Sequence, residues 1–304
     1  MHCLNKWFRM LFERKSQHNN VDNCDSLDFS EISKVEDQLT LSGCVVSDVG
    51  RVRTNNEDNF LLDTYINEDA AEHMQADITL TSHDFMSWHI FSVFDGMGGG
   101  EMGEVAANIA AKTFQRSCLC FHRDMKKFEI DSLLRKSFLD SNNQIVLLQE
   151  KYKVYGTTGT VLCTNGAEFK LYHLGDSRAY LLRDQQLIQL TKDQTLAQMK
   201  IDMGLYDDQD PLAESERHQL TEYIGKDWTK KNLKPSESDW QVFRSGDRIL
   251  LCSDGLYDMC NDTEIAEILT SAKCANDAAI NLTDAAIVKG GEDNTTCMVL
   301  FISK

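Results

Sequence analysis

Short apolar runs rich in β-branched and aromatic residues recur between residues 44 and 302, and this pattern predicts many β-strands. The expected strands cover residues 44–49, 59–63, 88–94, 160–164, 168–174, 179–183, 240–243, 249–253 and 296–302. Asn165-Gly166 lies between two of these runs and is typical of a tight hairpin turn. We therefore expect the strands to pair mostly antiparallel.

Two longer segments, 104–120 and 128–149, place apolar residues at helical spacing and predict helices. A third helical region, 262–288, is interrupted near residue 273, with Asp262 as the expected N-cap. Strands and helices come in blocks, which indicates an α+β fold and not a βαβ repeat. Two antiparallel sheets packed face to face with helices outside would bury all the apolar faces.

Two stretches lack a clear period. Residues 64–87 are expected to form a polar, acidic insertion, and residues 193–235 a long loop of the kind that is usually functional or disordered. Residues 16–40 are polar and acidic and are expected to form a linker. The sequence thus predicts an N-terminal amphipathic segment and linker over residues 1–40 and one domain over residues 41–304.

The beginning of the chain has an amphipathic pattern. Over residues 3–15, apolar side chains including Leu4, Trp7 and Leu11 share one helical face, while the basic residues fall elsewhere. The segment is too short and too charged to span a bilayer. Two interpretations remain: weak contact with an anionic membrane surface, which would place the protein at the inner face of the membrane, or a helix or tail packed on the protein itself.

Composition narrows the choice of partner and compartment. The formal net charge of −17 argues against nucleic acid, because phosphate contacts need clustered Lys and Arg, and suits a protein that gathers divalent cations. Simple solubility is the alternative reason for that charge. The ten cysteines contain no Cys-x-x-Cys pair and the chain shows no secretory signal pattern, so we expect reduced thiols in a cytoplasmic protein.

Acidic residues stand at the boundaries of several apolar runs, each beside Gly or Asn. They are Glu57 and Asp58 before the second expected strand, Asp95 after the third, Asp176 between two strands, Asp254 after the run 248–252, and Asp293 before the last strand. One Asp-Gly pair is a common turn signal. A whole set at strand ends is harder to explain as turns, and it predicts carboxylates gathered at one edge of the sheets.

Such a carboxylate set, without His or Cys, favours a hard cation such as Mg²⁺ or Mn²⁺ over zinc. Uncompensated carboxylates at close range raise one another's pKa, and divalent cations remove that cost. Two such ions also lower the pKa of a shared water from about 16 toward 7, and an Arg clamps a phosphate through its two-pronged donor face. The pattern therefore predicts metal-assisted phosphoester hydrolysis.

A family resemblance runs through these residues in their order. The motifs are Arg53 with Glu57-Asp58, Asp95-Gly96-Met97-Gly98-Gly99, Gly156-Thr157-Thr158, Gly175-Asp176-Ser177-Arg178, Asp254-Gly255 and Gly291-Glu292-Asp293-Asn294. From about residue 41 to residue 302 the chain resembles the type 2C serine/threonine protein phosphatases, the metal-dependent PPM class, and Met97 is similar to the bacterial branch. The resemblance implies an αββα sandwich, with residues 193–235 including a flap beside the active site.

The resemblance also implies a role for each residue at the metal centre. Asp95 would bridge two Mn²⁺ or Mg²⁺ ions, the Gly96 carbonyl would bind one of them, and Asp254 and Asp293 would bind the other. A hydroxide held between the two ions would attack phosphorus directly, without a phosphoenzyme.

Further roles follow from the same resemblance. Glu57 and Asp58 would act mainly through metal-bound waters, and Asp176 with Asp254 would contribute to a third, weaker metal site. Arg53 would hold the substrate phosphate, so that Arg53 and Asp95 are the expected catalytic residues. The expected partners are phosphoproteins, with a serine/threonine kinase and its targets among them.

Two departures from the family pattern affect the expected chemistry. Met97 stands where eukaryotic members often carry a His that is a proposed general acid, and Asp193-Gln194-Thr195 replaces the usual Asp-His-Ser. Protonation of the leaving group would then fall to a metal-bound water. Two alternatives stay open: a non-catalytic pseudophosphatase that binds partners through the same fold, and an acidic structural protein whose aspartates only form turns.

Overall fold

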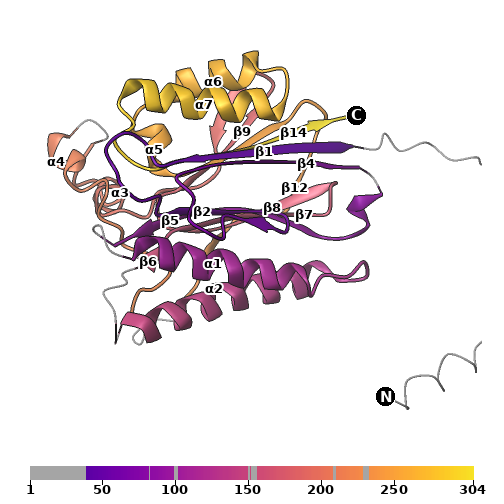
Figure 1. The fold of residues 1–304 in the computed structure, drawn as a ribbon, viewed down its shortest axis with the longest axis horizontal. Coiled ribbons are helices and arrows are strands. Elements are labelled where there is room, and N and C mark those ends of the chain that lie inside the picture. The colour runs from indigo at the N-terminus through magenta and orange to yellow at the C-terminus, as the bar shows by residue number, and fades with distance from the viewer. Residues whose placement is uncertain are drawn as a thin grey trace, which may run out of the picture. The chain divides into compact units, whose positions relative to one another are not determined.

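Two antiparallel sheets form the centre of the fold (Figure 1). The first sheet has the order β10 (Gln186–Gln189), β9 (Arg178–Arg183), β13 (Arg248–Cys252), β14 (Thr295–Ser303), β1 (Thr40–Asp48) and β4 (His73–Leu80). The second has the order β11 (Ser236–Glu237), β8 (Glu168–Leu174), β7 (Gly159–Thr164), β5 (His89–Met97), β2 (Asp58–Leu62) and β3 (Tyr65–Ile66), with β12 (Gln241–Val242) beside β8 and β6 (Gly156–Thr157) beside β5. The predicted antiparallel pairing is confirmed.

Helices cover the outer face of each sheet (Figure 1). Helices α1 (Gly103–Cys118) and α2 (Lys127–Gln149) lie on the second sheet, and α6 (Asp262–Ser271) and α7 (Ala275–Lys289) lie on the first. The remaining short helices are η1 (Asp84–Met86), α3 (Leu196–Asp202), α4 (Pro211–Glu214) and α5 (Asp254–Tyr257). The expected αββα sandwich is confirmed.

This computed structural model describes residues 39–81, 83–98, 102–149, 151, 156–207, 210–228 and 233–304. The amphipathic segment predicted over residues 3–15 lies outside them, as does nearly all of the predicted linker. The described residues belong to a single contact unit. The domain boundary at residue 40 stays a prediction.

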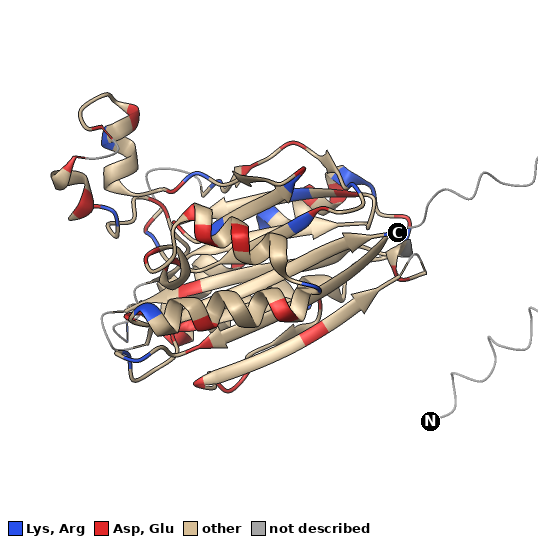
Figure 2. Ribbon diagram, turned by 90° about the horizontal axis from the view of Figure 1, so that it is seen from above, with Lys and Arg blue, Asp and Glu red and all other residues tan. Residues whose placement is uncertain are grey.

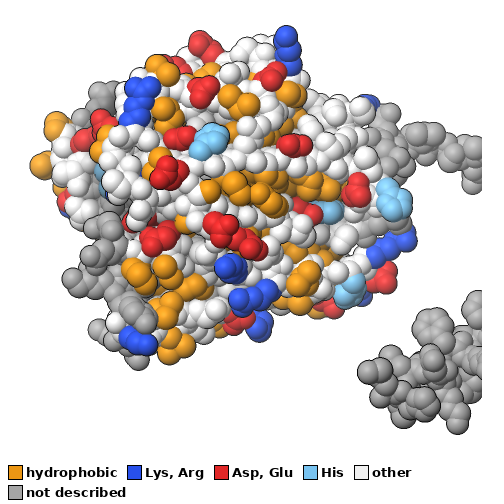
Figure 3. Space-filling view, in the orientation of Figure 1, with side chains coloured by type: hydrophobic (Ala, Val, Ile, Leu, Met, Phe, Trp, Pro, Cys, Tyr) orange, Lys and Arg blue, Asp and Glu red, His pale blue; other side chains and the backbone are white. Residues whose placement is uncertain are grey.

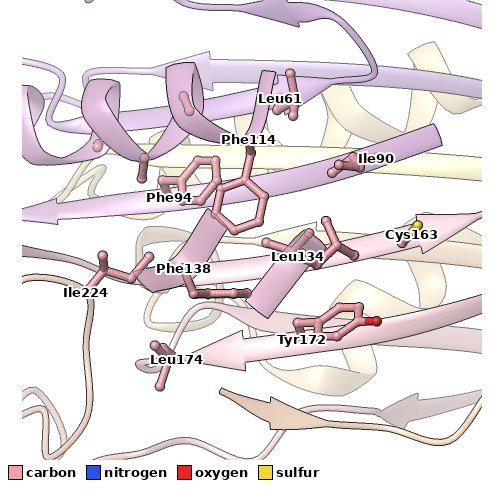
Figure 4. Packing of buried hydrophobic residues seen from close by; sticks show 14 of the residues in the cluster. Leu61, Ile90, Phe94, Phe114, Leu134, Phe138, Cys163, Tyr172, Leu174 and Ile224 are labelled. Atoms are coloured by element: carbon pink, nitrogen blue, oxygen red, sulfur yellow. The ribbon is translucent and has the colours of Figure 1, made fainter. Parts of the chain in front are cut away.

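Three apolar layers hold the sandwich together. One lies between the sheets, one between the first sheet and α6 and α7, and one between the second sheet and α1 and α2. In the last layer, Phe114 packs between Phe94 and Phe138, with ring centroids 5.5 and 4.9 Å apart (Figure 4). Ile224, from the segment predicted as the flap, is fully buried in the same layer. The flap is therefore fixed to the core at that point.

The structure corrects two expectations about local elements. Strand β4 lies where the sequence predicted only a polar insertion over residues 64–87. It is an edge strand that pairs with β1, and its outward positions are exposed and polar, so it lacks the apolar run of an inner strand. The N-cap of α6 is Asn261 and not Asp262, because Asn261 and Glu264 form a capping box.

Acidic and basic side chains are mixed over the surface. Figure 2 shows Asp and Glu on helices, strands and loops, with Lys and Arg among them. On the face drawn in Figure 3, hydrophobic side chains form a band across the middle, at the level between the two sheets. Within the described residues, no helix is long and apolar enough to cross a membrane.

Candidate metal centre

The predicted carboxylates meet where strand ends of both sheets come together. Asp95 in β5 lies directly opposite Asp58 in β2 in the strand register. Asp254 opens α5 after β13, and Asp293 comes just before β14. Asp176 occupies the turn between β8 and β9. The structure thus brings together residues from distant parts of the chain, as the sequence predicted.

Asp58 is the most fully supported carboxylate of the group. It is 2% exposed, and one of its oxygens accepts hydrogen bonds from Ser253 Oγ and Thr296 Oγ1, both at 2.7 Å. Burial raises the pKa of Asp58 to about 7 although these two bonds favour the charged form. Sequence reasoning missed both hydroxyls, because nothing marks them in their own local segments.

Asp95 has a fixed backbone and an unpaired carboxylate. Its amide donates to Thr158 Oγ1 at 2.9 Å, and its carbonyl accepts from the Thr158 amide at 2.8 Å. No hydrogen bond or ion pair reaches the Asp95 carboxylate from any residue in the described ranges. Burial, followed by repulsion from Asp254 and Asp58, raises its pKa well above the ordinary range. A cation beside this carboxylate would favour its charged form.

Two glycines allow the backbone around this carboxylate to pack closely. A Cβ on Gly96 would lie 2.3 Å from the carbonyl oxygen of Gly103 and 2.5 Å from that of Glu57. A Cβ on Gly103 would lie 2.5 Å from a Glu57 carboxylate oxygen and 2.8 Å from the Gly96 carbonyl oxygen. The first turn of α1 therefore rests against the carbonyl that was predicted to bind a metal.

Glu57 faces a second carboxylate that the sequence did not reveal. Glu57 is 7% exposed, and burial and then the charge of Glu104 raise its pKa. Oε2 of Glu104 is itself buried, without a hydrogen-bond partner among the described residues. A Glu in the first turn of a helix is usually explained by the helix dipole, so Glu104 gave no separate signal.

Asn294 holds the Glu57 loop in place. Its side chain accepts from the Glu57 amide at 2.8 Å and donates to the carbonyls of Val49 and Asn55, each at 2.9 Å. Asn294 directly follows Asp293, so the same short segment carries a predicted ligand and positions another.

Arg53 stands at the rim of the group. Its Nη2 donates to Asp293 Oδ2 at 2.6 Å, and the two side chains are 44% and 32% exposed. Burial and then the charge of Asp254 raise the pKa of Asp293, while Arg53 acts in the opposite direction. The guanidinium is accessible to a phosphate, as its predicted role requires.

Asp176 lies on the other side of Asp254. It is 5% exposed, and burial and then the charge of Asp254 raise its pKa well above the ordinary range. Its carbonyl accepts a hydrogen bond from the Tyr257 hydroxyl at 3.3 Å. The Arg178 guanidinium stacks 3.6 Å over the Tyr257 ring and pairs with Asp193 at 2.7 Å. Arg178 thus belongs to the support of this carboxylate.

A histidine from the flap also reaches the group, and sequence reasoning missed it. His218 Nδ1 lies 3.7 Å from Asp254 Oδ2 and 3.9 Å from Asp258 Oδ2. The nearby Asp254 carboxylate raises the pKa of His218 to about 9 against the lowering effect of burial, and Asp258 raises it further. No local pattern pairs residue 218 with residue 254, so only the fold shows this contact.

The donor set fits divalent cations. Six carboxylates interact electrostatically across the group. The pKa is raised for Glu57, Asp58, Asp95, Asp176 and Asp293. Among the described residues, the only ion pairs with a predicted ligand are those of Arg53 with Asp293 and of His218 with Asp254. Oxygen donors in this number suit Mn²⁺ or Mg²⁺. The unpaired Asp95 and the tight glycine cradle at Gly96 are explained by a cation at this point.

The sequence profile of the family "Protein phosphatase 2C" matches residues 42–200. This chain belongs to the protein phosphatase 2C family. The serine/threonine phosphatase stp of Listeria monocytogenes is 30% identical over 258 residues, which are 84% of this chain and 93% of the Listeria protein. The serine/threonine protein phosphatase PstP of Mycobacterium tuberculosis is 31% identical over 264 residues, 86% of this chain. The chain spans only 45% of the length of that mycobacterial relative.

Solved structures of this phosphatase family share the fold. The crystal structure of PstP from Mycobacterium tuberculosis has a TM-score of 0.69 and 29% identity, and the match covers 87% of this chain and all of that chain. A second structure, the PstP catalytic domain in complex with two manganese ions, has a TM-score of 0.66, 29% identity and 88% coverage of this chain. The predicted family and its bacterial character are confirmed.

Proposed function

We propose that this chain is a metal-dependent protein serine/threonine phosphatase that hydrolyses phosphoserine and phosphothreonine. The observation that carries the proposal is the buried, unpaired carboxylate of Asp95 at the centre of a complete carboxylate set, with Arg53 at its rim. A non-catalytic pseudophosphatase would be expected to have lost a ligand. All seven predicted ligands are present, which favours an active phosphatase over that alternative.

The cofactors proposed are two Mn²⁺ or Mg²⁺ ions, with a third in a weaker site. Asp95 and the Gly96 carbonyl would hold the first ion, and Asp95, Asp254 and Asp293 the second. Support comes from the two manganese ions in the related PstP structure and from the oxygen donors described above. When bound, the ions supply a water of lowered pKa and neutralise charge that develops on the phosphate.

The other residues position the substrate and the ligands. Arg53 would leave its pairing with Asp293 in part and take two phosphate oxygens in a bidentate contact. Asp58, held by two hydroxyls, and Glu57, held through its amide, would orient waters around the ions. Met97 has no proton to donate, so the side chain at this position gives no acid for the leaving serine or threonine oxygen.

Phosphopeptide hydrolysis tests the proposal directly. We expect activity with Mn²⁺ that EDTA abolishes, and a loss of at least about 100-fold in Asp95→Asn and in Asp254→Asn, because each removes a ligand charge. Asp284→Asn, an exposed carboxylate on α7, is the matched control and should keep wild-type activity. Activity that is indifferent to EDTA would rule out the proposed mechanism.

We further infer that the substrates include a serine/threonine kinase and its targets, as the family resemblance implies. Comparing the phosphoproteomes of cells with and without the protein tests this inference. Phosphosites on a serine/threonine kinase should rise when the phosphatase is absent. A change confined to proteins unrelated to any such kinase would contradict it.

We also propose that residues 3–15 give weak contact with an anionic membrane surface, which would place the protein at the inner face of the membrane. The amphipathic pattern of that segment is the support. A fluorescent protein fused to residues 1–20 should bind vesicles with anionic lipid and not neutral ones. A fusion that stays unbound with both would contradict the proposal.

A further inference from the structure

We propose that His218 and Asp258 complete the third cation site beside Asp254 and Asp176, so that the bound cation fastens the flap to the core. The inference rests on the proposed function only in taking Asp254 as a metal ligand. What it adds is a nitrogen donor, a further carboxylate and a mechanical role, none of which the family resemblance implied for this chain.

The donors come from two independent parts of the fold. His218 lies in the flap beyond α4, whereas Asp254 and Asp258 are the first residue and the C-cap of α5. One ligand atom from each of these three residues lies within 4.8 Å of the other two. A cation held by all three would therefore link the flap to the helix that follows β13.

The separations are those of donors placed around a cation and not those of a closed ion pair. His218 Nδ1 stands 3.7 Å from Asp254 Oδ2 and 3.9 Å from Asp258 Oδ2, both beyond ordinary hydrogen-bond length. Two donors at about 2.1 Å from one metal lie about 3.0 Å apart at a right angle and about 4.2 Å apart when opposite. The observed spacing falls within this range.

A buried carboxylate next to the three donors points to the same ligand. Asp176 is 5% exposed, and its side chain has no hydrogen bond or ion pair with another residue in the described part of the chain. It interacts electrostatically with both Asp254 and His218. An unpaired buried carboxylate at this place needs a positive partner, and a cation among the four side chains supplies it.

There is also room on the flap side of this site. A cavity of about 290 Å³ is lined by His218, Asp258 and Tyr257 together with residues of the flap. Waters that fill the remaining coordination positions of the cation can be held there. One imidazole among carboxylates suits Mn²⁺ better than Mg²⁺, which prefers oxygen ligands and its own waters.

Pulsed electron paramagnetic resonance on the full chain loaded with Mn²⁺ tests the nitrogen donor. We expect hyperfine coupling to an imidazole nitrogen once the weaker class of sites fills. His218→Ala should remove this coupling and weaken that class about tenfold or more. His122→Ala, an exposed histidine between α1 and α2, is the control and should change neither. Absence of nitrogen coupling in the wild type, or its persistence in His218→Ala, overturns the inference.

Trypsin cleavage after Arg217 tests the fastening of the flap. Saturating Mn²⁺ should slow cleavage of this bond several-fold in the wild type and in Asp284→Asn, and the protection should be lost in Asp258→Asn. Equal protection in Asp258→Asn contradicts the proposal. Phosphatase activity separates the two proposals: an active enzyme without nitrogen coupling contradicts this inference alone, and an inactive enzyme with the coupling contradicts the proposed function alone.

Discussion

Glu104 and Glu57 place two carboxylates against each other at the first turn of α1. The pKa of Glu57 is raised by burial and by Glu104, and Glu104 keeps a buried oxygen without a partner among the described residues. In the metal-free protein this arrangement is repulsive, and a cation with its waters relieves it. Glu104 therefore acts on the metal site from outside the set of predicted ligands.

Glu104→Gln should make the metal-free protein more stable and the response to metal smaller. Removal of one charge relieves repulsion of about 1 kcal/mol, which corresponds to a Tm increase of about 2–4 °C. Melting curves in EDTA and in Mn²⁺ measure both effects. Glu267→Gln on α6 is the control. A variant that melts below the wild type in EDTA would contradict the repulsive interaction.

The Asn294 side chain makes three hydrogen bonds that position the Glu57 loop. Asn294→Ala removes three hydrogen bonds and leaves the buried Glu57 amide without its acceptor. We expect a loss of about 2–4 kcal/mol in the free energy of unfolding, since each net bond contributes about 1 kcal/mol. Urea denaturation measures it, with the exposed Asn281→Ala as the control. A loss equal to that of the control would show that the bonds do not hold the loop.

At the scale of elements, the contact between α1 and β5 depends on two glycines. Gly96→Ala would push a methyl group into backbone oxygens that cannot move aside as a side chain would. We expect weaker Mn²⁺ binding, loss of phosphopeptide hydrolysis, and destabilisation of about 1–3 kcal/mol or more. Gly246 has a φ of +98° and open space around it. Gly246→Ala is therefore a control that measures the effect of backbone strain alone. Activity that survives in Gly96→Ala would contradict the close packing.

The start of β5 carries a separate electrostatic contact. His89 Nδ1 lies 2.9 Å from Asp63 Oδ1, and its Nε2 lies 3.0 Å from the Asp84 carbonyl oxygen. Burial lowers the pKa of His89, but the contacts with Asp63 and Asp84 outweigh it and the pKa is raised. The stabilisation is therefore fully present below about pH 6.5, and it is lost as the pH rises through the pKa of the folded state.

Asp63→Asn should reveal this dependence. The wild type should exceed the variant in stability by more at pH 5.5 than at pH 8.5, because the protonated His89 gains more from the carboxylate than the neutral ring does. Asn also tolerates the positive φ of 60° at this position. Urea denaturation in Mn²⁺ at the two pH values measures the difference. A gap that is constant with pH would contradict the contact as the source.

At the scale of the whole molecule, the carboxylate group makes the metal-free protein sensitive to pH. Burial raises the pKa of Asp58 and of Asp258 to about 7, above the ordinary value near 4. The folded state therefore binds more protons than the unfolded one, and stability falls as the pH rises from about 4 to about 7. In EDTA we expect a lower Tm at pH 8 than at pH 6. Mn²⁺ should raise the Tm more at pH 8, and an equal shift at both values would contradict this account.

Much of the fold and of the candidate site could be predicted because their signals are local. Apolar runs mark the inner strands, and Asp95, Asp254 and Asp293 stand at run boundaries beside Gly or Asn. The rest depends on tertiary contact. Strand β4 has a polar outer face that hides its role, and neither Glu104 nor His218 has a sequence neighbour that shows what it faces in space. Their roles exist only once distant segments are packed together.

The place of β14 in the first sheet has a consequence for synthesis on the ribosome. It is the last strand along the chain, yet it lies between β13 and β1, and it pairs residue by residue with the first strand. A nascent chain can pair β1 with β4 early, but the other edge of β1 stays open until β14 has emerged. Asp293 emerges at the same late stage. Closure of the sheet and completion of the carboxylate group therefore happen at the same stage of synthesis, and a product truncated before Asp293 can complete neither.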